Sequence, residues 1–141
     1  MQFPYTRYQA QPASFDPNRQ DIELPHIPIT LIGPGGREVE VLALVDSGAD
    51  ISYLGPQHAH FLGIDIRSGL LDQCTGIGGA NDCYYHSGIT IEVGSHRLKI
   101  GAHFAESWPH NFAILGRKDF FERFKVTIDE LRKLVSLAPH K

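Results

Sequence analysis

The sequence predicts a mostly β domain with the form of a barrel. Short segments that alternate apolar and polar residues follow one another from His26 onward. Glycine-rich turns separate these segments, as at residues 33–36. Only residues 118–124 have the apolar spacing of a sizeable helix. Many short strands with one late helix favour a barrel-like β domain over an α/β fold.

Composition and charge exclude several classes of function. The 141 residues suit a single domain with its own core, and the formal net charge is −3. No dense block of Lys and Arg is present, so we expect no nucleic-acid partner. The longest apolar run, residues 41–45, is far too short to span a membrane. The N-terminal residues lack the apolar core of a signal peptide, so a cytoplasmic location and free thiols are expected for the two cysteines.

Residues 1–24 are predicted to form an N-terminal arm. They are rich in Pro, Gln, Asn and Tyr and show no periodicity. Four aromatic residues indicate that part of the arm packs against the body of the protein, and a role in dimer contacts is the alternative; they are Phe3, Tyr5, Tyr8 and Phe15.

The first two predicted strands lead to the most informative residues of the chain. Residues 27–32 alternate in polarity and end at a glycine-rich turn. Residues 39–45 carry apolar side chains on both faces, which indicates a central, buried strand. This strand delivers Asp46 to the interior of the domain.

The later elements are shorter. Residues 56–63 begin with proline and end with glycine, as a short helix does. Residues 88–93 and 96–100 are predicted to form a hairpin about residues 94–95, and residues 125–129 and 133–137 a terminal hairpin. Between them, the helix at residues 118–124 should bury one side, formed by Phe120, Phe121 and Phe124.

The tripeptide Asp46-Ser47-Gly48 is the strongest functional signal. A carboxylate directly after a buried strand is expensive to ionise alone, and a small hydroxyl and a glycine suit a tight turn that approaches another group closely. The chain has only one such tripeptide.

Three segments, taken in order, resemble one lobe of the retropepsin-like branch of the aspartic proteases. Residues 43–52, Ala-Leu-Val-Asp-Ser-Gly-Ala-Asp-Ile-Ser, resemble the active-site loop of that family. Residues 75–79 resemble its glycine-rich flap, and residues 113–117, Ala-Ile-Leu-Gly-Arg, its closing element. The resemblance covers roughly residues 25–137 and assigns residues 25–141 to a protease domain. It implies a barrel lobe with a flap hairpin and one short C-terminal helix.

The resemblance also implies an activity and a partner. Two Asp46 carboxylates, one from each chain of a homodimer, would activate a water to hydrolyse peptides or unfolded proteins. Ser47 would hydrogen-bond across the dimer, and Gly48 would let the substrate backbone approach. Asp50, beside Ala49, would hold the substrate main chain, and Arg117 would pair with Asp50 and brace the loop.

The substrate pocket follows from the same alignment. The loop at residues 109–112 is expected beside the catalytic pair, with apolar pockets on both sides of the cut bond. The expected substrate-binding residues, besides Ala49 and Asp50, are Ile77, Gly78, Gly79, Phe112 and Ile114.

Two cysteines flank the flap segment. A turn at residues 78–79 would place Cys74 and Cys83 directly opposite each other, where a disulfide could form, whereas the family-like turn at residues 77–78 makes them diagonal neighbours. Free thiols are favoured because no signal peptide indicates an oxidising compartment.

Two other functions compete with the peptidase. A module of the same fold could bind peptides or dimerise without catalysis, since fold does not imply activity. A metal-dependent hydrolase rests only on the eight histidines, which lack a metal-ligand spacing such as H-x-x-x-H. We therefore expect no metal site and no cofactor.

Overall fold

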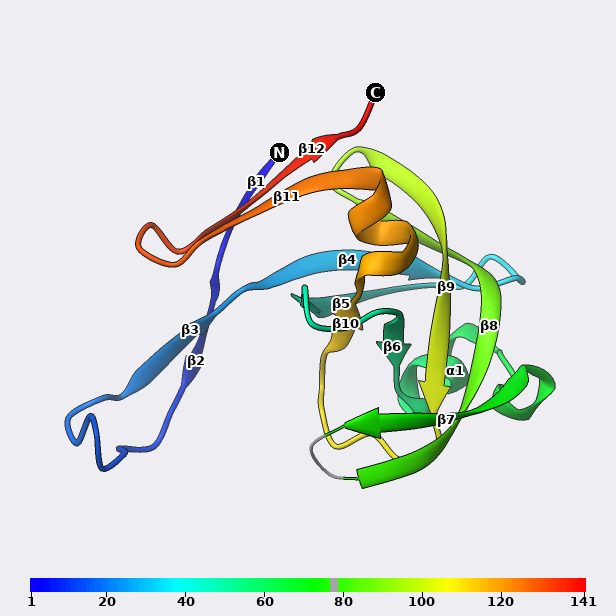
Figure 1. The fold of residues 1–141 in the computed structure, drawn as a ribbon, viewed down its shortest axis with the longest axis horizontal. Helices are drawn as coiled ribbons and strands as arrows, with labels where there is room; N and C mark the ends of the chain where they lie inside the picture. The colour runs from blue at the N-terminus through cyan, green and yellow to red at the C-terminus, as the bar shows by residue number, and fades with distance from the viewer. Residues whose placement is uncertain (77–78) are drawn as a thin grey trace.

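The computed structural model describes residues 1–76 and 79–141 and is mostly β, as the sequence predicts (Figure 1). Two short helices and a helical turn accompany the strands; the helical elements are α1 (Pro56–Leu62), η1 (Ile66–Ser68) and η2 (Arg117–Phe121). The strands are β1 (Gln2–Pro4), β2 (Thr6–Gln9), β3 (Asp21–Leu24), β4 (His26–Ile32), β5 (Glu38–Val45), β6 (Ser52–Leu54), β7 (Leu70–Gly76), β8 (Gly79–Val93), β9 (His96–Ala105), β10 (Ala113–Leu115), β11 (Phe124–Asp129) and β12 (Leu134–Pro139).

The central sheet closes on itself. Its strands follow the order β4-β5-β10-β6-β9-β8-β7, and β8 also pairs with β4. This extra pairing sets Leu31 opposite Ile91 and closes a barrel of β4, β5, β10, β6, β9 and β8. Strand β7 lies outside the barrel and forms a hairpin with β8. The short strand β10 runs parallel to β5 in the middle of the sheet. The ends of β5 and β10, far apart in the sequence, therefore lie side by side.

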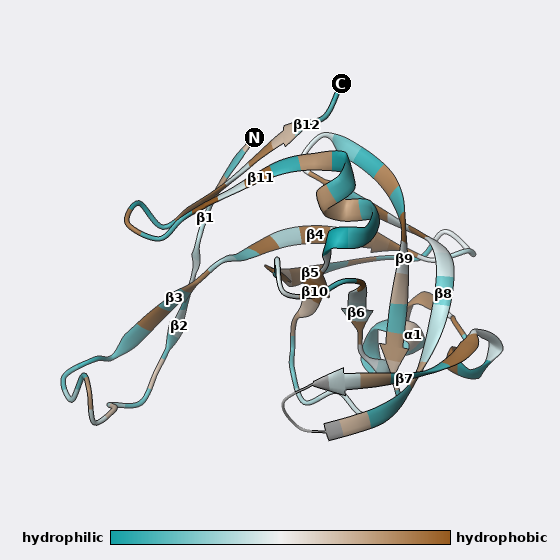
Figure 2. Cartoon of the chain, viewed as in Figure 1, coloured by the Kyte–Doolittle hydropathy of each residue, from teal (hydrophilic) through white to brown (hydrophobic). Residues whose placement is uncertain are grey.

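The core fills the barrel. Figure 2 shows hydrophobic segments on β5, β9 and β10, where alternate side chains point inward. The largest fully buried side chains include Phe104, Leu31 and Ile91 from the barrel, with Phe120 and Phe124 from its C-terminal side. In the part of the chain that the structure describes, no helix has the length and apolarity to cross a membrane.

The N-terminal segment is more ordered than its sequence indicates. Strand β1 pairs with β12, which pairs with β11 in a three-stranded terminal sheet, and Tyr5 is buried. Strands β2 and β3 form a separate hairpin that projects from the body (Figure 1). The prediction of packing through aromatic residues thus holds for Phe3 and Tyr5, whereas Phe15 is 82% exposed at the far end of the hairpin.

The two predicted helices differ in outcome. Helix α1 begins at Pro56 and ends before Gly63, whose φ of 72° favours glycine. The predicted helix at residues 118–124 is wrong in length: Lys118 and Asp119 have non-helical backbone angles, and β11 begins at Phe124. Phe120 and Phe124, four residues apart, are both buried as the pattern predicts, but Phe124 belongs to strand β11 rather than to a helix.

Candidate active site

The loop after β5 is held in a tight turn. Val45, the last residue of β5, is buried, and the Asp46 N–H donates to the carbonyl of Leu115 at 3.0 Å. The Ala49 N–H donates to the Asp46 carbonyl at 3.2 Å, and the Gly48 N–H donates to Oδ1 of Asp46 at 2.9 Å. The carboxylate of Asp46 is therefore oriented by its own turn. Asp46 is half-buried, and Ser47 and Gly48 are exposed.

A second segment, residues 116–118, supports this loop from the other side. The Arg117 N–H donates to the Ala49 carbonyl and the Lys118 N–H to the Asp50 carbonyl, each at 2.8 Å. The Gly116 N–H donates to Oγ of Ser52 at 3.0 Å, and Ser52 is fully buried. A Cβ on Gly116 would lie 2.6 Å from the Ile51 carbonyl carbon, so only glycine fits there. The two predicted motifs thus meet through their backbones.

The predicted ion pair between Arg117 and Asp50 is wrong for the single chain. Arg117 is exposed, and no ion pair joins it to Asp50 within residues 1–76 and 79–141. The Asp50 carboxylate instead accepts the N–H of Ile51 at 2.9 Å. Arg117 supports the loop through its main chain rather than through its charge.

Two supporting residues carry no clear signal in the sequence. Ser52 follows the motif as the first residue of β6, and its burial becomes apparent only once β6 lies in the barrel. Asp119 has a φ of 68°, and its Oδ2 accepts the N–H of Gly101 at 2.7 Å, which ties η2 to β9. A single polar residue in a buried strand suggests a structural hydrogen bond, and this is the signal that could have drawn attention to Ser52.

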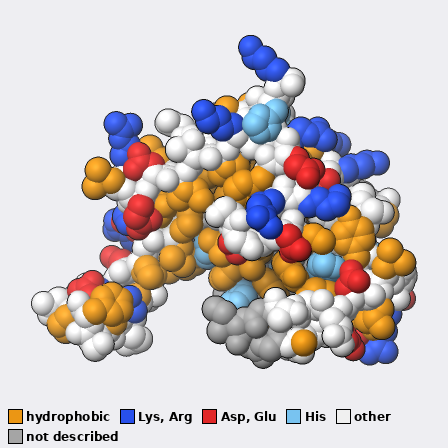
Figure 3. All heavy atoms as spheres, in the orientation of Figure 1, with side chains coloured by type: hydrophobic (Ala, Val, Ile, Leu, Met, Phe, Trp, Pro, Cys, Tyr) orange, Lys and Arg blue, Asp and Glu red, His pale blue; other side chains and the backbone are white. Residues whose placement is uncertain are grey.

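The predicted pocket loop, residues 109–112, lines a hollow of about 540 Å³. Tyr8 and Leu24 of the arm, His26 of β4 and residues 40–42 of β5 form the rest of its wall. Phe112 and Ile114 are both half-buried, and Ile114 lies in register with Leu44 on β5. Figure 3 shows a hollowed face rich in hydrophobic side chains between the projecting hairpin and the body. The hollow follows the strands that lead to the Asp46 loop.

An aromatic cluster in this hollow was not predicted. His26 is 2% exposed, its Nδ1 lies 2.6 Å from the hydroxyl of Tyr8, and its ring centroid lies 4.3 Å from that of Phe112. Burial lowers the pKa of His26, and the nearby His110 lowers it further. His110 stacks on Phe112 at a centroid distance of 4.7 Å. The arm thus contributes a residue to the pocket, which no local pattern indicates.

The β7–β8 hairpin carries the predicted flap sequence. Gly79 is described and pairs with Gly76, whereas Ile77 and Gly78 lie outside the described residues. This ladder makes Cys74 and Cys83 diagonal neighbours, with Cα atoms 6.0 Å apart, and the two form a disulfide. The expectation of free thiols is therefore wrong, because the diagonal distance lies within the range that a disulfide spans.

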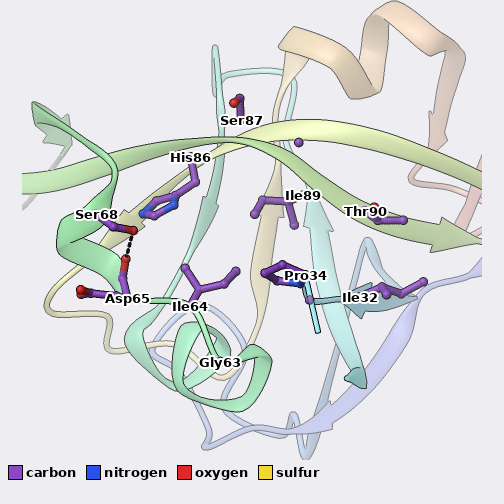
Figure 4. A pocket seen from close by; sticks show the side chains of 12 residues that line it. Ile32, Pro34, Gly63, Ile64, Asp65, Ser68, His86, Ser87, Ile89 and Thr90 are labelled. Carbon is purple, nitrogen blue, oxygen red and sulfur yellow. Dashed lines mark hydrogen bonds between the residues drawn. The ribbon is translucent and has the colours of Figure 1, made fainter. Parts of the chain in front are cut away.

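A second cavity, of about 320 Å³, lies away from all of these residues. It is enclosed by the β4–β5 turn, the end of α1, η1 and β8 (Figure 4). His86 and Ser68 face it, and each already has a hydrogen-bond partner. His86 Nε2 bonds the carbonyl of Ile66, and the Ser68 hydroxyl donates to the carbonyl of Asp65. None of the site residues that the sequence predicts lines this cavity.

Comparisons with known proteins agree with this geometry. The model of a family described as "Aspartyl protease" matches residues 27–117. A search of curated proteins gives no match.

Two solved structures are similar to the chain. The retroviral protease-like domain of Ddi1 from Leishmania major is similar with a TM-score of 0.55 and 20% identity, over 81% of this chain and 87% of that one, which shows a shared fold. EIAV protease in complex with the inhibitor HBY-793 has a TM-score of 0.49 and 25% identity, over 67% of this chain and 82% of that one.

Proposed function

The chain belongs to the aspartyl protease family, and from this premise we propose that it is an aspartic endopeptidase that acts as a homodimer. The observation that carries the proposal is the Asp46 loop, which backbone hydrogen bonds to β10 and to the segment after it hold at the end of β5. One chain supplies one such carboxylate, because the sequence contains a single Asp-Ser-Gly. The second carboxylate must then come from another copy of the chain across a two-fold axis.

Two facing Asp46 carboxylates supply the chemistry of peptide hydrolysis. Like charges about 3 Å apart cannot both ionise, so the pair holds one proton and titrates as a unit. The ionised carboxylate accepts a proton from the attacking water, and the protonated one donates to the carbonyl oxygen of the peptide. The Gly48 N–H that bonds Oδ1 fixes which face each carboxylate presents.

The exposed residues of the loop have roles in this proposal. Ser47, exposed in the single chain, hydrogen-bonds the loop of the partner copy. Gly48 lets the substrate backbone approach, and Ala49 and Asp50 hold the substrate main chain. Arg117 keeps this edge in place through its N–H bond to Ala49.

The β7–β8 hairpin serves as the flap in the proposed dimer. In this proposal the backbone of Gly78 and Gly79 hydrogen-bonds the substrate, and Ile77 reaches over the bound peptide; Ile77 and Gly78 lie outside the described residues. Phe112 and Ile114, half-buried beside the loop, provide apolar walls. Because such pockets separate similar apolar groups by only about 1–3 kcal/mol, we expect broad hydrophobic selectivity.

The proposal is tested by the cleavage of an unfolded protein at mildly acid pH, with and without a statine inhibitor that mimics the tetrahedral intermediate. Wild type should cleave, Asp46→Asn should not, and both should sediment as dimers in the presence of the inhibitor. Asp65→Asn is the matched control, because Asp65 is exposed and an asparagine can still accept the N–H of Arg67.

Three results would contradict parts of the proposal. Cleavage by Asp46→Asn would place the catalysis elsewhere, and an active monomer would exclude the carboxylate pair. A wild-type dimer that binds the statine but does not cleave would be a peptide-binding module of the same fold.

A further inference from the structure

Four chemically active side chains lie on one face of three neighbouring strands. In the β7–β8 ladder Asp72 is opposite Cys83, and Cys74 is its diagonal neighbour. In the β8–β9 ladder Tyr85 is opposite His103, so Cys83 and His103 also share a face. Side chains two positions apart point to the same side of a strand. Asp72, Cys74, Cys83 and His103 are therefore brought together by the register.

The distances confirm that this grouping is close. The sulfurs of Cys74 and Cys83 and a ring nitrogen of His103 all lie within 4.8 Å of one another. Cys83 is completely buried, His103 is 7% exposed, and Cys74 is half-buried. Because Cys74 is half-buried, a small solute can reach these three side chains from its side, although Cys83 and His103 are buried.

One nitrogen of His103 has no partner among the described residues. Its Nε2 bonds the Asp72 carboxylate at 2.9 Å, and because a carboxylate only accepts, Nε2 carries the proton. Its Nδ1 is buried and unpartnered within the described part of the chain, so it presents a lone pair. The ring is also held between Tyr53 and Tyr85, at centroid distances of 5.4 and 5.6 Å. An unpaired buried acceptor in a fixed ring is expensive unless a ligand completes it.

We propose that, when the disulfide is reduced, Cys74, Cys83 and His103 form a binding site for a zinc-like metal ion. Two thiolates and one imidazole are the ligands that Zn²⁺ prefers, and water would fill the fourth tetrahedral position. Two thiolates neutralise the divalent charge, so the complex is compatible with burial. Asp72 holds the imidazole in the tautomer that binds metal, as carboxylates commonly do around metal-bound histidines.

The chemistry balances with a thiol reductant. Two reductant thiols become one disulfide and give two electrons, which break the bond between the sulfurs of Cys74 and Cys83. The two cysteines take up the two protons as thiols. The metal then replaces those protons, which pass to solvent. The site is separate from Asp46 and goes beyond the proposed peptidase, although it joins both strands of the β7–β8 hairpin to β9.

The test uses the full chain, reduced with a water-soluble phosphine, which becomes its oxide and binds zinc weakly. Co²⁺ is added without oxygen as a spectroscopic probe. Reduced wild type should bind one Co²⁺ per chain, with thiolate-to-cobalt charge-transfer absorption that Zn²⁺ removes. The oxidised protein should give no such absorption.

Three variants separate this site from adventitious binding at surface histidines. Cys74→Ser should remove the charge-transfer signal of one thiolate and weaken binding by more than about 100-fold, since it deletes a direct ligand. Asp72→Asn should weaken binding by about 10–100-fold, as the loss of an orienting group does. His60→Gln, at an exposed histidine, is the matched control and should bind as wild type does.

Cys74 is half-buried and the Asp72 side chain is 53% exposed, so both residues can be changed without opening the core. The test therefore does not depend on a buried substitution. The proposal is overturned if the reduced protein binds no Co²⁺. It is equally overturned if Cys74→Ser keeps the full signal, or if His60→Gln loses it. An unchanged affinity in Asp72→Asn would refute the assigned role of that carboxylate.

Discussion

Gly116→Ala should damage the candidate site through a single added methyl group. The new Cβ would meet the carbonyl carbon of Ile51 at 2.6 Å, its oxygen at 2.7 Å and the oxygen of Ala49 at 2.9 Å. All three are backbone atoms, so no side-chain rotation relieves the contact. The φ of −98° at Gly116 suits alanine, so the whole effect comes from the clash.

The loss in free energy of unfolding can be estimated from the displacement of the Asp46 loop that the methyl group forces. Forcing a methyl group into a packed site costs about 1–3 kcal/mol. The loop is attached next to Gly116 by the bonds from Arg117 to Ala49 and from Lys118 to Asp50, and each lost bond adds about 0.5–1.5 kcal/mol. With both bonds lost, we therefore expect the free energy of unfolding to fall by about 2–6 kcal/mol. Peptidase kcat should fall about 100-fold, since a displacement of about 1 Å at a reacting group has that effect.

The assay is denaturant unfolding at one fixed protein concentration, because dimerisation makes stability depend on concentration. Gly35→Ala is the matched control: its Cβ would have no neighbour within 4 Å, and the loss of glycine entropy should stabilise it by up to about 1 kcal/mol. A free energy of unfolding for Gly116→Ala within about 0.5 kcal/mol of wild type would refute the reasoning.

Three further predictions concern the same region and its surroundings. Ser52→Ala leaves the buried N–H of Gly116 without its acceptor and should lower the free energy of unfolding by about 1–3 kcal/mol; no loss in a denaturant titration would mean that the bond is replaced. Burial lowers the pKa of His58 from its ordinary value of 6.5, and its Nδ1 accepts the N–H of Gly55, so the unfolded chain takes up the proton first as the pH falls. Stability should therefore fall below pH 6.5, by up to about 1.4 kcal/mol per pH unit for this group, and His58→Asn should flatten a pH series of unfolding curves; equal slopes would contradict this. Phe112→Ala should change which apolar residues flank the cut when a denatured proteome is digested, whereas an unchanged profile would remove Phe112 from the pocket.

The parts of the fold that local patterns encode were predictable. The apolar run to Val45, the helix Pro56–Leu62 and the hairpin about residues 94–95 depend on neighbours in sequence. The pairing of Ala113–Leu115 with β5 depends on closure of the barrel, which no local pattern indicates. The resemblance predicted that these segments belong together, but not that backbone bonds would join them.

The differences between prediction and structure have separate physical causes. The resemblance implies the ion pair between Arg117 and Asp50, whereas the Arg117 side chain is exposed in the single chain. The cysteines were assigned from the expected compartment, although the ladder register decides how close they lie. Tyr8 reaches His26 because β2 pairs with β3, and β4 follows directly after β3.

The support of the Asp46 loop by a distant segment has a consequence for biosynthesis. During translation Asp46 leaves the ribosome long before residues 113–118 are made. Until then the turn lacks its bonds to Leu115 and Arg117, and β5 lacks its neighbour β10. Pairing of such distant segments is also a slow step of folding. A nascent chain therefore has the Asp-Ser-Gly sequence without the bonds that hold its turn, and the proposed peptidase activity has to wait until residues 113–118 are made.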